Sequence, residues 1–408
     1  MLFLLSVITY LDRIAISSAG PRISEDLGLS PRQMGLVFSM FVFGYGIFEI
    51  PGGWMGDRFG PRLILTRIVV WWSAFTALTG TVRQYWQLLA CRFLFGAGEA
   101  GAYPNCSCTI SRWFPFRERA RAHSVVWTAS RLGAVISPLL VLPLQNALGW
   151  RTVFYMFGVV GVFWAVAWFT WFRDWPHLKS GVTPAEMAEI GAGTPAAHAS
   201  LPLGAFRSPN LWAVMLMYHF YCYGSYWFFS WMPTYLVKAK DIHAFATYAA
   251  LPPLLGALAN LAGGWTSDAL VRKIGLRWGR RSIGVVSMAG AGALMLAAMA
   301  IENRTLAIVA LSLSFGISDF MLPTCWAVCL DIGKRYAGTV TGAMNMAGQF
   351  GATIMSYVYG DLVERHGWNA PLAGVAVMSL VSALFWLKID ASKTLEPPEP
   401  QMNADKRR

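Results

Sequence analysis

The sequence predicts an all-α integral membrane protein, with twelve transmembrane helices arranged as two pseudo-symmetric six-helix bundles. Three observations predict this fold: a composition poor in charge, twelve apolar runs of membrane-spanning length, and a motif that occurs once in each half of the chain. Of the 408 residues, 56% are apolar and 13% are charged, and the mean hydropathy is +0.46. Soluble globular proteins carry about 25% charged residues. The composition therefore excludes a soluble enzyme, a nucleic-acid-binding protein and a disordered scaffold.

The apolar runs have the length that a bilayer requires. A transmembrane helix needs about 20 predominantly apolar residues. Twelve such runs lie between polar breaks in this chain. We expect helices near residues 1–20, 34–53, 63–81, 85–111, 123–145, 152–172, 211–237, 247–266, 282–301, 306–331, 339–363 and 370–388.

The basic residues predict the orientation of these helices. Loops on the side of the inter-bundle linker hold 22 of the 33 Lys and Arg residues, and the opposite loops hold 8. Because loops rich in Lys and Arg stay in the cytoplasm, we expect both termini to be cytoplasmic. The net charge of +12 then reflects topology and contact with anionic lipid, and requires no nucleic acid. No basic residue precedes Asp12, so we also expect a further cytoplasmic lead before Met1.

The chain contains an internal repeat. The sequence Gly-Gly-Trp-Met-Gly-Asp at 52–57 recurs as Gly-Gly-Trp-Thr-Ser-Asp 211 residues later, and a Gly-Trp pair at 149 recurs 218 residues later. Two halves related in this way are typical of transporters that work by alternating access. We expect a first bundle at 1–173, a cytoplasmic linker at 174–210, a second bundle at 211–389 and a polar tail at 390–408. In the linker, Thr183 and Glu186 are expected to cap a short surface helix.

The first copy of the repeated motif continues into a basic loop. Glycines at this position allow two helix ends to approach closely. Asp57 is expected to cap the N-terminus of a neighbouring helix, and the arginines to bridge to a facing helix. Such contacts would hold the cytoplasmic side closed and break when that side opens. The residues of this predicted latch are Gly53, Asp57, Arg58, Gly60 and Arg62, with Asp268 in the second copy.

The glycine–acid–basic spacing of this loop, together with twelve spans, resembles the major facilitator superfamily. The resemblance covers essentially the whole chain. It implies the major facilitator fold, and we expect a monomer.

Six ionisable residues fall inside the predicted spans of the first bundle. Such residues cost about 2.5 to 3.5 kcal/mol each on insertion scales, so they are candidates for function. Two of them, Arg92 and Glu99, are seven residues apart, which places them on one helix face about 10 Å apart along the axis. A substrate, or a partner from the first span, fits between them. The six residues are Asp12, Arg13, Glu49, Arg92, Glu99 and Arg131.

These charges suggest a way to couple protons to an anion. If Asp12 and Glu99 are protonated from outside, the pocket becomes net positive and attracts an anion. If they release their protons inward, the carboxylates compete for the arginines and expel it. The alternative is that the six residues form permanent ion pairs between helices.

The same residues resemble the anion:cation symporter family. The resemblance rests on Tyr10-Leu11-Asp12-Arg13, on Tyr45 before Ile50-Pro51-Gly52-Gly53-Trp54, and on Arg92 with Glu99. Bacterial members of this family take up sugar acids such as galactonate, glucarate and hexuronates with protons, across the inner membrane. The resemblance implies that Asp12 and Glu99 carry protons, that Arg92 couples them to the substrate, and that Arg13, Tyr10 and Tyr45 shape the site. It also implies that Asn345 hydrogen-bonds the substrate.

Some residues depart from the family pattern or give weaker signals. Arg131 replaces a glutamine of the galactonate transporters. It either favours a dianionic substrate or forms an ion pair with Glu49, and Glu49 is also a candidate gate. Asp319 is a further acid in an apolar span, and its role is that of a gate, a site residue or a structural residue. Tyr223 and Trp227 either line the cavity or pack in an aromatic core.

The sequence shows no metal-ligand set and no phosphate-binding loop, so we expect no cofactor other than the coupling protons. The function predicted is proton-coupled symport of a small organic anion. Two alternatives from other classes remain open here. One is a membrane enzyme that uses Glu99, Asp12 or Asp319 as an acid or base, and the other is a nutrient sensor that binds without translocation.

Overall fold

The computed structural model describes residues 1–190, 203–232, 235–236, 239–240 and 246–395, so the predicted linker and tail lie partly outside the described residues. In these ranges the regular structure is helical throughout. The elements are α1 (Leu2–Leu27), α2 (Pro31–Phe59), α3 (Pro61–Thr79), α4 (Tyr85–Glu99), α5 (Ala102–Trp113), η1 (Phe116–Glu118), α6 (Arg119–Leu148), α7 (Trp150–Trp171), η2 (Pro176–Leu178), α8 (Pro184–Ile190), η3 (Leu203–Arg207), α9 (Pro209–Ser230), α11 (Ala246–Met299), α12 (Arg304–Phe320), α13 (Leu322–Gly333), η4 (Lys334–Tyr336), α14 (Ala337–His366) and α15 (Asn369–Lys388).

The helices follow the apolar runs. The expected spans 247–266 and 282–301 lie in the two parts of α11, which are separated at Gly275, where a φ of 82° and a ψ of 168° interrupt the helix. Among the described residues, seven segments are long and apolar enough to cross a membrane by length and composition, and the segments 250–299 and 304–355 each cover most of two expected spans. Side chains such as Leu139 and Phe163, each 72% exposed, are suited to contact lipid.

The linker contains the short helix that the sequence predicts. Thr183 Oγ1 accepts the backbone N–H of Glu186 at 3.2 Å, and Glu186 Oε2 accepts the backbone N–H of Thr183 at 2.8 Å. The capping box is therefore confirmed at the start of α8. The hydrogen bonds from Thr183 lower the pKa of the exposed Glu186 carboxyl.

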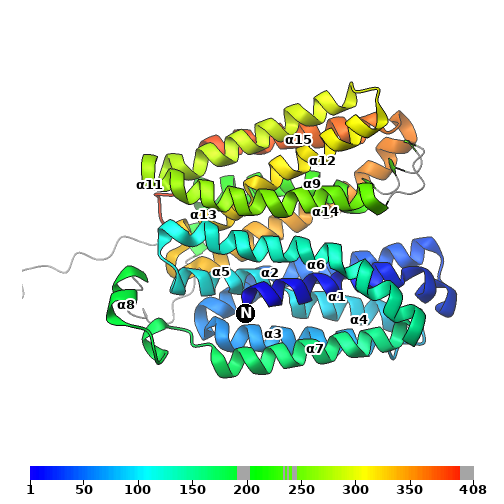
Figure 1. The fold of residues 1–408 in the computed structure, drawn as a ribbon, viewed down its shortest axis with the longest axis horizontal. Coiled ribbons are helices and arrows are strands. Elements are labelled where there is room, and N and C mark those ends of the chain that lie inside the picture. The colour runs from blue at the N-terminus through cyan, green and yellow to red at the C-terminus, as the bar shows by residue number, and fades with distance from the viewer. Residues whose placement is uncertain (191–202, 233–234, 237–238, 241–245, 396–408) are drawn as a thin grey trace, which may run out of the picture.

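The helices form two layers (Figure 1): α1 to α7 make up one layer, and α9 with α11 to α15 make up the other, while α8 lies beyond one end. We call that end the linker end. The two layers repeat the same packing. In the first, α1 contacts α6, α2 contacts α4, and α3 contacts α7; in the second, α9 contacts α14, and α11 contacts both α12 and α15. Between the layers, α2 packs on α14 and α6 packs on α11.

Glycines bring α2 and α4 into backbone contact. A Cβ atom at Gly44 would lie 2.4 Å from the carbonyl oxygen of Phe93, and one at Gly96 would lie 2.3 Å from that of Phe41. Only glycine permits this approach. It places Tyr45 and Phe41 of α2 directly beside the helix that carries Arg92 and Glu99.

A helix break follows a buried acid in each layer. Helix α4 ends at Glu99, and Gly101 then adopts a φ of 84° before α5 begins. Helix α12 ends one residue after Asp319, and α13 follows Met321. The residues after the breaks form a further repeat that the sequence analysis missed: Pro104-Asn105-Cys106 in α5 and Pro323-Thr324-Cys325 in α13. Discontinuous helices in transporters lie at binding sites.

Candidate functional site

An arginine–carboxylate pair lies at the centre of the first layer. Arg13 Nε of α1 donates to Glu99 Oε1 of α4 at 2.5 Å. Three tyrosines and a phenylalanine surround the Arg13 guanidinium, which lies 4.5 Å from the Tyr45 ring centroid. The others are Phe41 at 5.3 Å, Tyr10 at 5.4 Å and Tyr103 at 5.8 Å. Two sequence-predicted charges and two predicted tyrosines therefore meet in one aromatic box.

Arg92 and Asp12 complete this central cluster. Arg92 interacts electrostatically with Glu99 and Asp12. Its guanidinium packs over the rings of Phe41 at 4.8 Å and Phe95 at 4.9 Å. Within the described part of the chain, Arg92 forms no carboxylate ion pair. The two arginines and two acids are net neutral when all four are ionised, so protonation of either acid makes the cluster cationic.

Several polar atoms of the cluster have no hydrogen-bond partner in the described residues, although they are buried. Buried polar groups in proteins are almost always hydrogen-bonded, so such atoms mark a place for water, protons or a ligand. The set contains both acceptors and donors. It consists of both carboxylate oxygens of Asp12, Arg13 Nη2, Arg92 Nε, Glu99 Oε2 and the Tyr103 hydroxyl.

A polar chain links this cluster to the second layer. Asn345 Nδ2 of α14 donates to Glu49 Oε1 at 2.8 Å and to the Tyr45 hydroxyl at 3.3 Å. Gln349 Nε2 donates to Asn345 Oδ1 at 3.5 Å, and the Tyr226 hydroxyl donates to Gln349 Oε1 at 3.0 Å. The predicted residues Asn345, Glu49 and Tyr45 therefore lie together where α2 faces α14.

Arg131 forms a buried ion pair across the two layers. Its Nε atom donates to Asp319 Oδ2 at 2.8 Å, and its Nη2 atom donates to Asp319 Oδ1 at 3.1 Å. The pairing of Arg131 with Glu49 that the sequence left open is thus wrong. Because α6 packs on α11 and α13 of the other layer, Arg131 reaches an acid of that half, and Glu49 is bound to Asn345 instead.

Tyr223 and Trp227 lie in the aromatic core of the second layer. Tyr223 packs edge-to-face on Tyr359 with ring centroids 5.1 Å apart, and Trp227 packs on Phe228 at 5.0 Å. Both belong to a buried cluster with other apolar residues of that layer. In the contacts described for these side chains, neither touches Arg13 or Arg92. Their placement favours the packing alternative over a role in the cavity.

The two repeated aspartates cap helices of the opposite layer. Asp57 Oδ1 accepts the backbone N–H of Gly338 at 2.8 Å, and its Oδ2 accepts that of Thr339 at 2.7 Å, in the first turn of α14. Asp268 Oδ2 accepts the backbone N–H of Arg121 at 2.8 Å, in the first turn of α6. A carboxylate stabilises the N-terminus of a helix by hydrogen bonding and by its charge. Each acid therefore ties its own layer to the other at the linker end.

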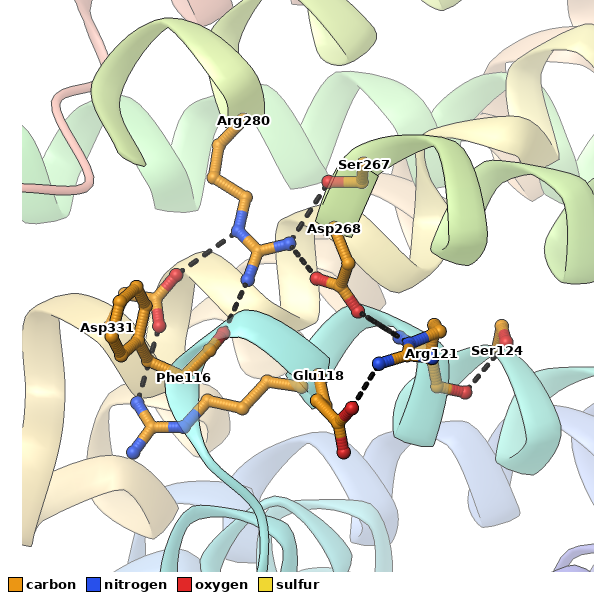
Figure 2. Close-up of polar contacts among 9 residues, drawn as sticks. Phe116, Glu118, Arg121, Ser124, Ser267, Asp268, Arg280 and Asp331 are labelled. Carbon is orange, nitrogen blue, oxygen red and sulfur yellow. Dashed lines mark hydrogen bonds and ion pairs between the residues drawn. The ribbon is translucent and has the colours of Figure 1, made fainter. Parts of the chain in front are cut away.

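Arg280 extends the second of these contacts into a buried network (Figure 2). It donates to Asp268 Oδ1 at 2.7 Å, to Asp331 Oδ2 at 3.2 Å and to the carbonyl oxygen of Phe116 at 3.1 Å. Arg119 of α6 donates to the other oxygen of Asp331 at 3.2 Å. Three charged groups of the second layer are thus joined to η1 and α6 of the first layer.

The arginines of the predicted latch remain within the first layer. Arg58 packs over Trp54 at 5.3 Å. The backbone N–H of Arg62 donates to Asp174 Oδ1 at 2.8 Å, and its side chain donates to the carbonyl oxygen of Phe169. Burial raises the pKa of the Asp174 carboxyl, and the Arg62 hydrogen bond and the Arg112 charge oppose that shift. Gly60 leads into α3 with a φ of 87°, against Asp174.

Gly53→Ala is expected to disfavour the closed linker end. A Cβ atom at Gly53 would lie 2.1 Å from the backbone oxygen of Gly338, which cannot rotate away. Overpacking of this kind costs about 1 to 3 kcal/mol, which lowers the closed population about 5- to 150-fold. A cysteine in place of Ser124, buried at the same interface beside Gly264, should then label faster with a water-soluble thiol reagent in a background without the native cysteines.

Gly46→Ala is the matched control on the same helix. A Cβ atom at Gly46 would lie 3.5 Å from Gln349 Cβ, which is an ordinary contact. Labelling in this variant should match that of the parent protein. Equal labelling rates in the two alanine variants would contradict the assignment of Gly53 to the closing contact.

Sequence reasoning missed several residues of the site. Phe41 and Tyr103 lie against Arg13, while Tyr221, Asn260 and Gln349 belong to the polar contacts of the second layer. Aromatic and amide side chains in apolar spans carry no signal of their own. The position of Tyr103 four residues after Glu99, in the same predicted span, is the clue that the sequence offered.

Comparison with known proteins identifies the family. The family model described as Major Facilitator Superfamily matches residues 2–356, and again 277–407. The chain belongs to the Major Facilitator Superfamily. It is 35% identical over 407 residues to the "Probable sulfoacetate transporter SauU" of Cupriavidus necator, covering 97% of this chain and 94% of that protein. It is 30% identical over 399 residues to the "Probable L-galactonate transporter" of Escherichia coli, covering 95% and 87% of the two chains.

The fold is also that of this superfamily. The crystal structure of the human organic anion transporter MFSD10 superposes with a TM-score of 0.75 at 14% identity, covering 94% of this chain and 97% of that one. The major facilitator fold predicted from the sequence is thus confirmed. Because the relatives are transporters and not enzymes, the superfamily member described here is a multi-pass membrane transporter.

Proposed function

We propose that this transporter is a proton-coupled symporter of a small organic anion, most consistent with a sugar acid such as a hexonate, hexarate or hexuronate. The observation that carries the proposal is the central cluster: the buried Arg92 and the partly buried Arg13 beside two buried acids, with unpartnered polar atoms on all four side chains. Arg92 and Arg13 provide the positive charge for the anion. Asp12 and Glu99 provide the carboxylates that take up and release protons.

The coupling follows from the charges. When Glu99 is ionised, it holds Arg13 at 2.5 Å and competes with a bound anion. When Glu99 and Asp12 are protonated, both arginines are free to bind an acidic group of the substrate through charge-assisted hydrogen bonds. Proton release on the other side restores the competition and expels the anion. Tyr10, Tyr45 and Asn345 provide hydroxyl and amide groups for the hydroxyls of a sugar acid.

The linker-end contacts support alternating access. Asp57 and Asp268 each cap a helix of the other layer, and these bonds must break before that end opens. In this proposal the linker end is cytoplasmic and both termini lie there, in a bacterial inner membrane. The transporter works as a monomer, because one chain supplies both layers.

Sulfoacetate is the second candidate substrate, because SauU is named for it and the similarity to SauU covers 97% of this chain. Both candidates are small, hydrophilic anions with a group that an arginine pair can bind. They differ in the second polar group, which is a hydroxylated chain in one case and a sulfonate in the other.

The test is uptake by proteoliposomes that contain the purified protein. Radiolabelled D-galactonate, D-glucuronate, D-galactarate and sulfoacetate are offered in turn, under an inward proton gradient. We expect accumulation of at least one of these anions, abolished by a protonophore. Binding without accumulation would support a sensor, and accumulation that ignores the protonophore would contradict proton coupling.

A further inference from the structure

Asp319 has a hydrogen-bonding environment that is complete within its own layer. It accepts from the Tyr221 hydroxyl of α9 at 2.5 Å and from Asn260 Nδ2 of α11 at 3.3 Å. The two bonds from Arg131 are the described contacts that reach Asp319 from the first layer. Asp319 therefore keeps two hydrogen bonds of its own layer when Arg131 leaves it, whereas each hydrogen bond described for Arg131 goes to Asp319.

Asn260 presents an acceptor that the carboxylate cannot use. Its Oδ1 atom is buried and has no hydrogen-bond partner in the described residues, although its Nδ2 atom already donates to Asp319. An ionised carboxylate has no proton to donate, but a carboxylic acid has one. A protonated Asp319 can donate to Asn260 Oδ1 while it still accepts from Asn260 Nδ2. Asn260 Oδ1 can thus accept a hydrogen bond from Asp319 only when Asp319 is protonated.

The internal repeat places Asp319 in the position that Glu99 holds in the first layer. Glu99 is the last residue of α4 and Asp319 the last but one of α12, and each is followed by a break in its helix. Asp319 follows Glu99 by 220 residues, close to the 218 residues between the two Gly-Trp pairs. Each acid also holds one arginine: Arg13 in the first case and Arg131 in the second.

One tyrosine interacts with both arginines. The Arg13 guanidinium is 5.4 Å from the Tyr10 ring, and Tyr10 also interacts electrostatically with Arg131. The groups that face Asp319 from the packed helices are Arg131 of α6, and Tyr221 and Cys222 of α9. No second carboxylate competes for Arg131 among the contacts of the described residues.

We propose that Asp319 is a proton-binding site of the second layer, and that its protonation releases Arg131 to bind a second acidic group of the substrate. The proton adds to one carboxylate oxygen of Asp319, and the new O–H donates to Asn260 Oδ1. Asp319 then carries no charge, so the Arg131 guanidinium leaves Asp319 and binds the anion. When the proton leaves, Asp319 takes Arg131 back and displaces the substrate. The substrate step rests on the proposed function, and the site then accepts a dianion with acidic groups at both ends.

The proton-binding step is tested without substrate. Infrared difference spectra between low and high pH are recorded on the purified full chain in lipid. We expect a protonated-carboxyl band that is absent from Asp319→Asn and present in Asp331→Asn. Asp331 is the matched control, because it is also buried and bound to two arginines, Arg119 and Arg280. Identical spectra for the parent protein and Asp319→Asn would overturn the proposal, whether or not the protein transports any anion tested.

The release of Arg131 is tested with two anions that share a carbon chain. D-galactarate has a carboxylate at each end, and D-galactonate has one. In binding measurements at low pH, Arg131→Gln should weaken galactarate about tenfold or more, as expected for loss of a charge-assisted hydrogen bond, and change galactonate far less. Asp319→Asn should bind galactarate with a weaker dependence on pH than the parent protein, because Arg131 is free throughout while Asp12 and Glu99 still take up protons. Equal losses for both anions in Arg131→Gln would refute the part assigned to Arg131.

Discussion

Arg92→Ala is expected to abolish anion uptake while the protein still inserts and folds. Arg13 is held by Glu99 and Arg131 by Asp319, whereas Arg92 forms no described ion pair and leaves its Nε atom unpartnered. It is therefore the arginine of the site that is ready for an anion. A hydrogen bond to a charged group contributes about 1.5 to 3 kcal/mol, and two such bonds correspond to a loss of about 100-fold or more. The measurement is initial uptake by proteoliposomes.

Two further variants separate charge from geometry. Arg92→Lys keeps the positive charge but loses the planar pair of donors, so we expect partial recovery with weaker affinity. Arg83→Ala removes an exposed arginine outside the cluster and should leave uptake unchanged. If Arg92→Ala transports like the parent protein, Arg92 is a structural residue and the proposed substrate site is wrong.

Glu99→Gln is expected to uncouple transport from protons. Glutamine keeps the shape of the side chain and mimics the uncharged acid, so Arg13 is freed for the anion at every pH. The variant should exchange internal for external substrate, because exchange needs no net proton movement. It should not accumulate substrate under a proton gradient, because position 99 no longer takes up or releases a proton.

The assay compares counterflow with gradient-driven uptake in the same proteoliposomes. Counterflow should remain within a few-fold of the parent protein, and gradient-driven accumulation should fall to the level of protonophore-treated vesicles. Glu302→Gln changes an exposed acid and serves as the control for both measurements. A Glu99→Gln protein that still concentrates its substrate would show that Glu99 is not a proton carrier.

The elements of the fold followed from the sequence because the bilayer sets their length and composition. The apolar runs and the motif repeated at 52–57 and 263–268 predicted a two-fold transporter, and the family match and the MFSD10 superposition confirm that fold. The helix at Thr183–Glu186 followed from local capping chemistry. The breaks after Glu99 and Asp319 did not, because the apolar runs 85–111 and 306–331 continue across them.

The members of the central cluster were also accessible to sequence reasoning, since a charge inside an apolar run is costly and so stands out. The pairing of these charges between helices could not be predicted from the sequence. Arg131 was compatible with Glu49 by charge alone, and only the packing of α6 on the second layer brings it to Asp319. Tyr223 and Trp227 show the same limit, because an aromatic residue in an apolar span looks alike whether it faces a cavity or a core.

The sequence by itself determined which segments are long and apolar enough to cross a membrane, that a motif of the first half recurs in the second, and which ionisable residues lie among apolar ones. These properties depend on local composition and on the free energy of placing charge in lipid. The tertiary structure alone decided which acid holds which arginine, and that Asp57 and Asp268 each cap a helix of the opposite layer. Such pairings depend on the register and contact of helices that are far apart in the chain, and composition does not record that geometry.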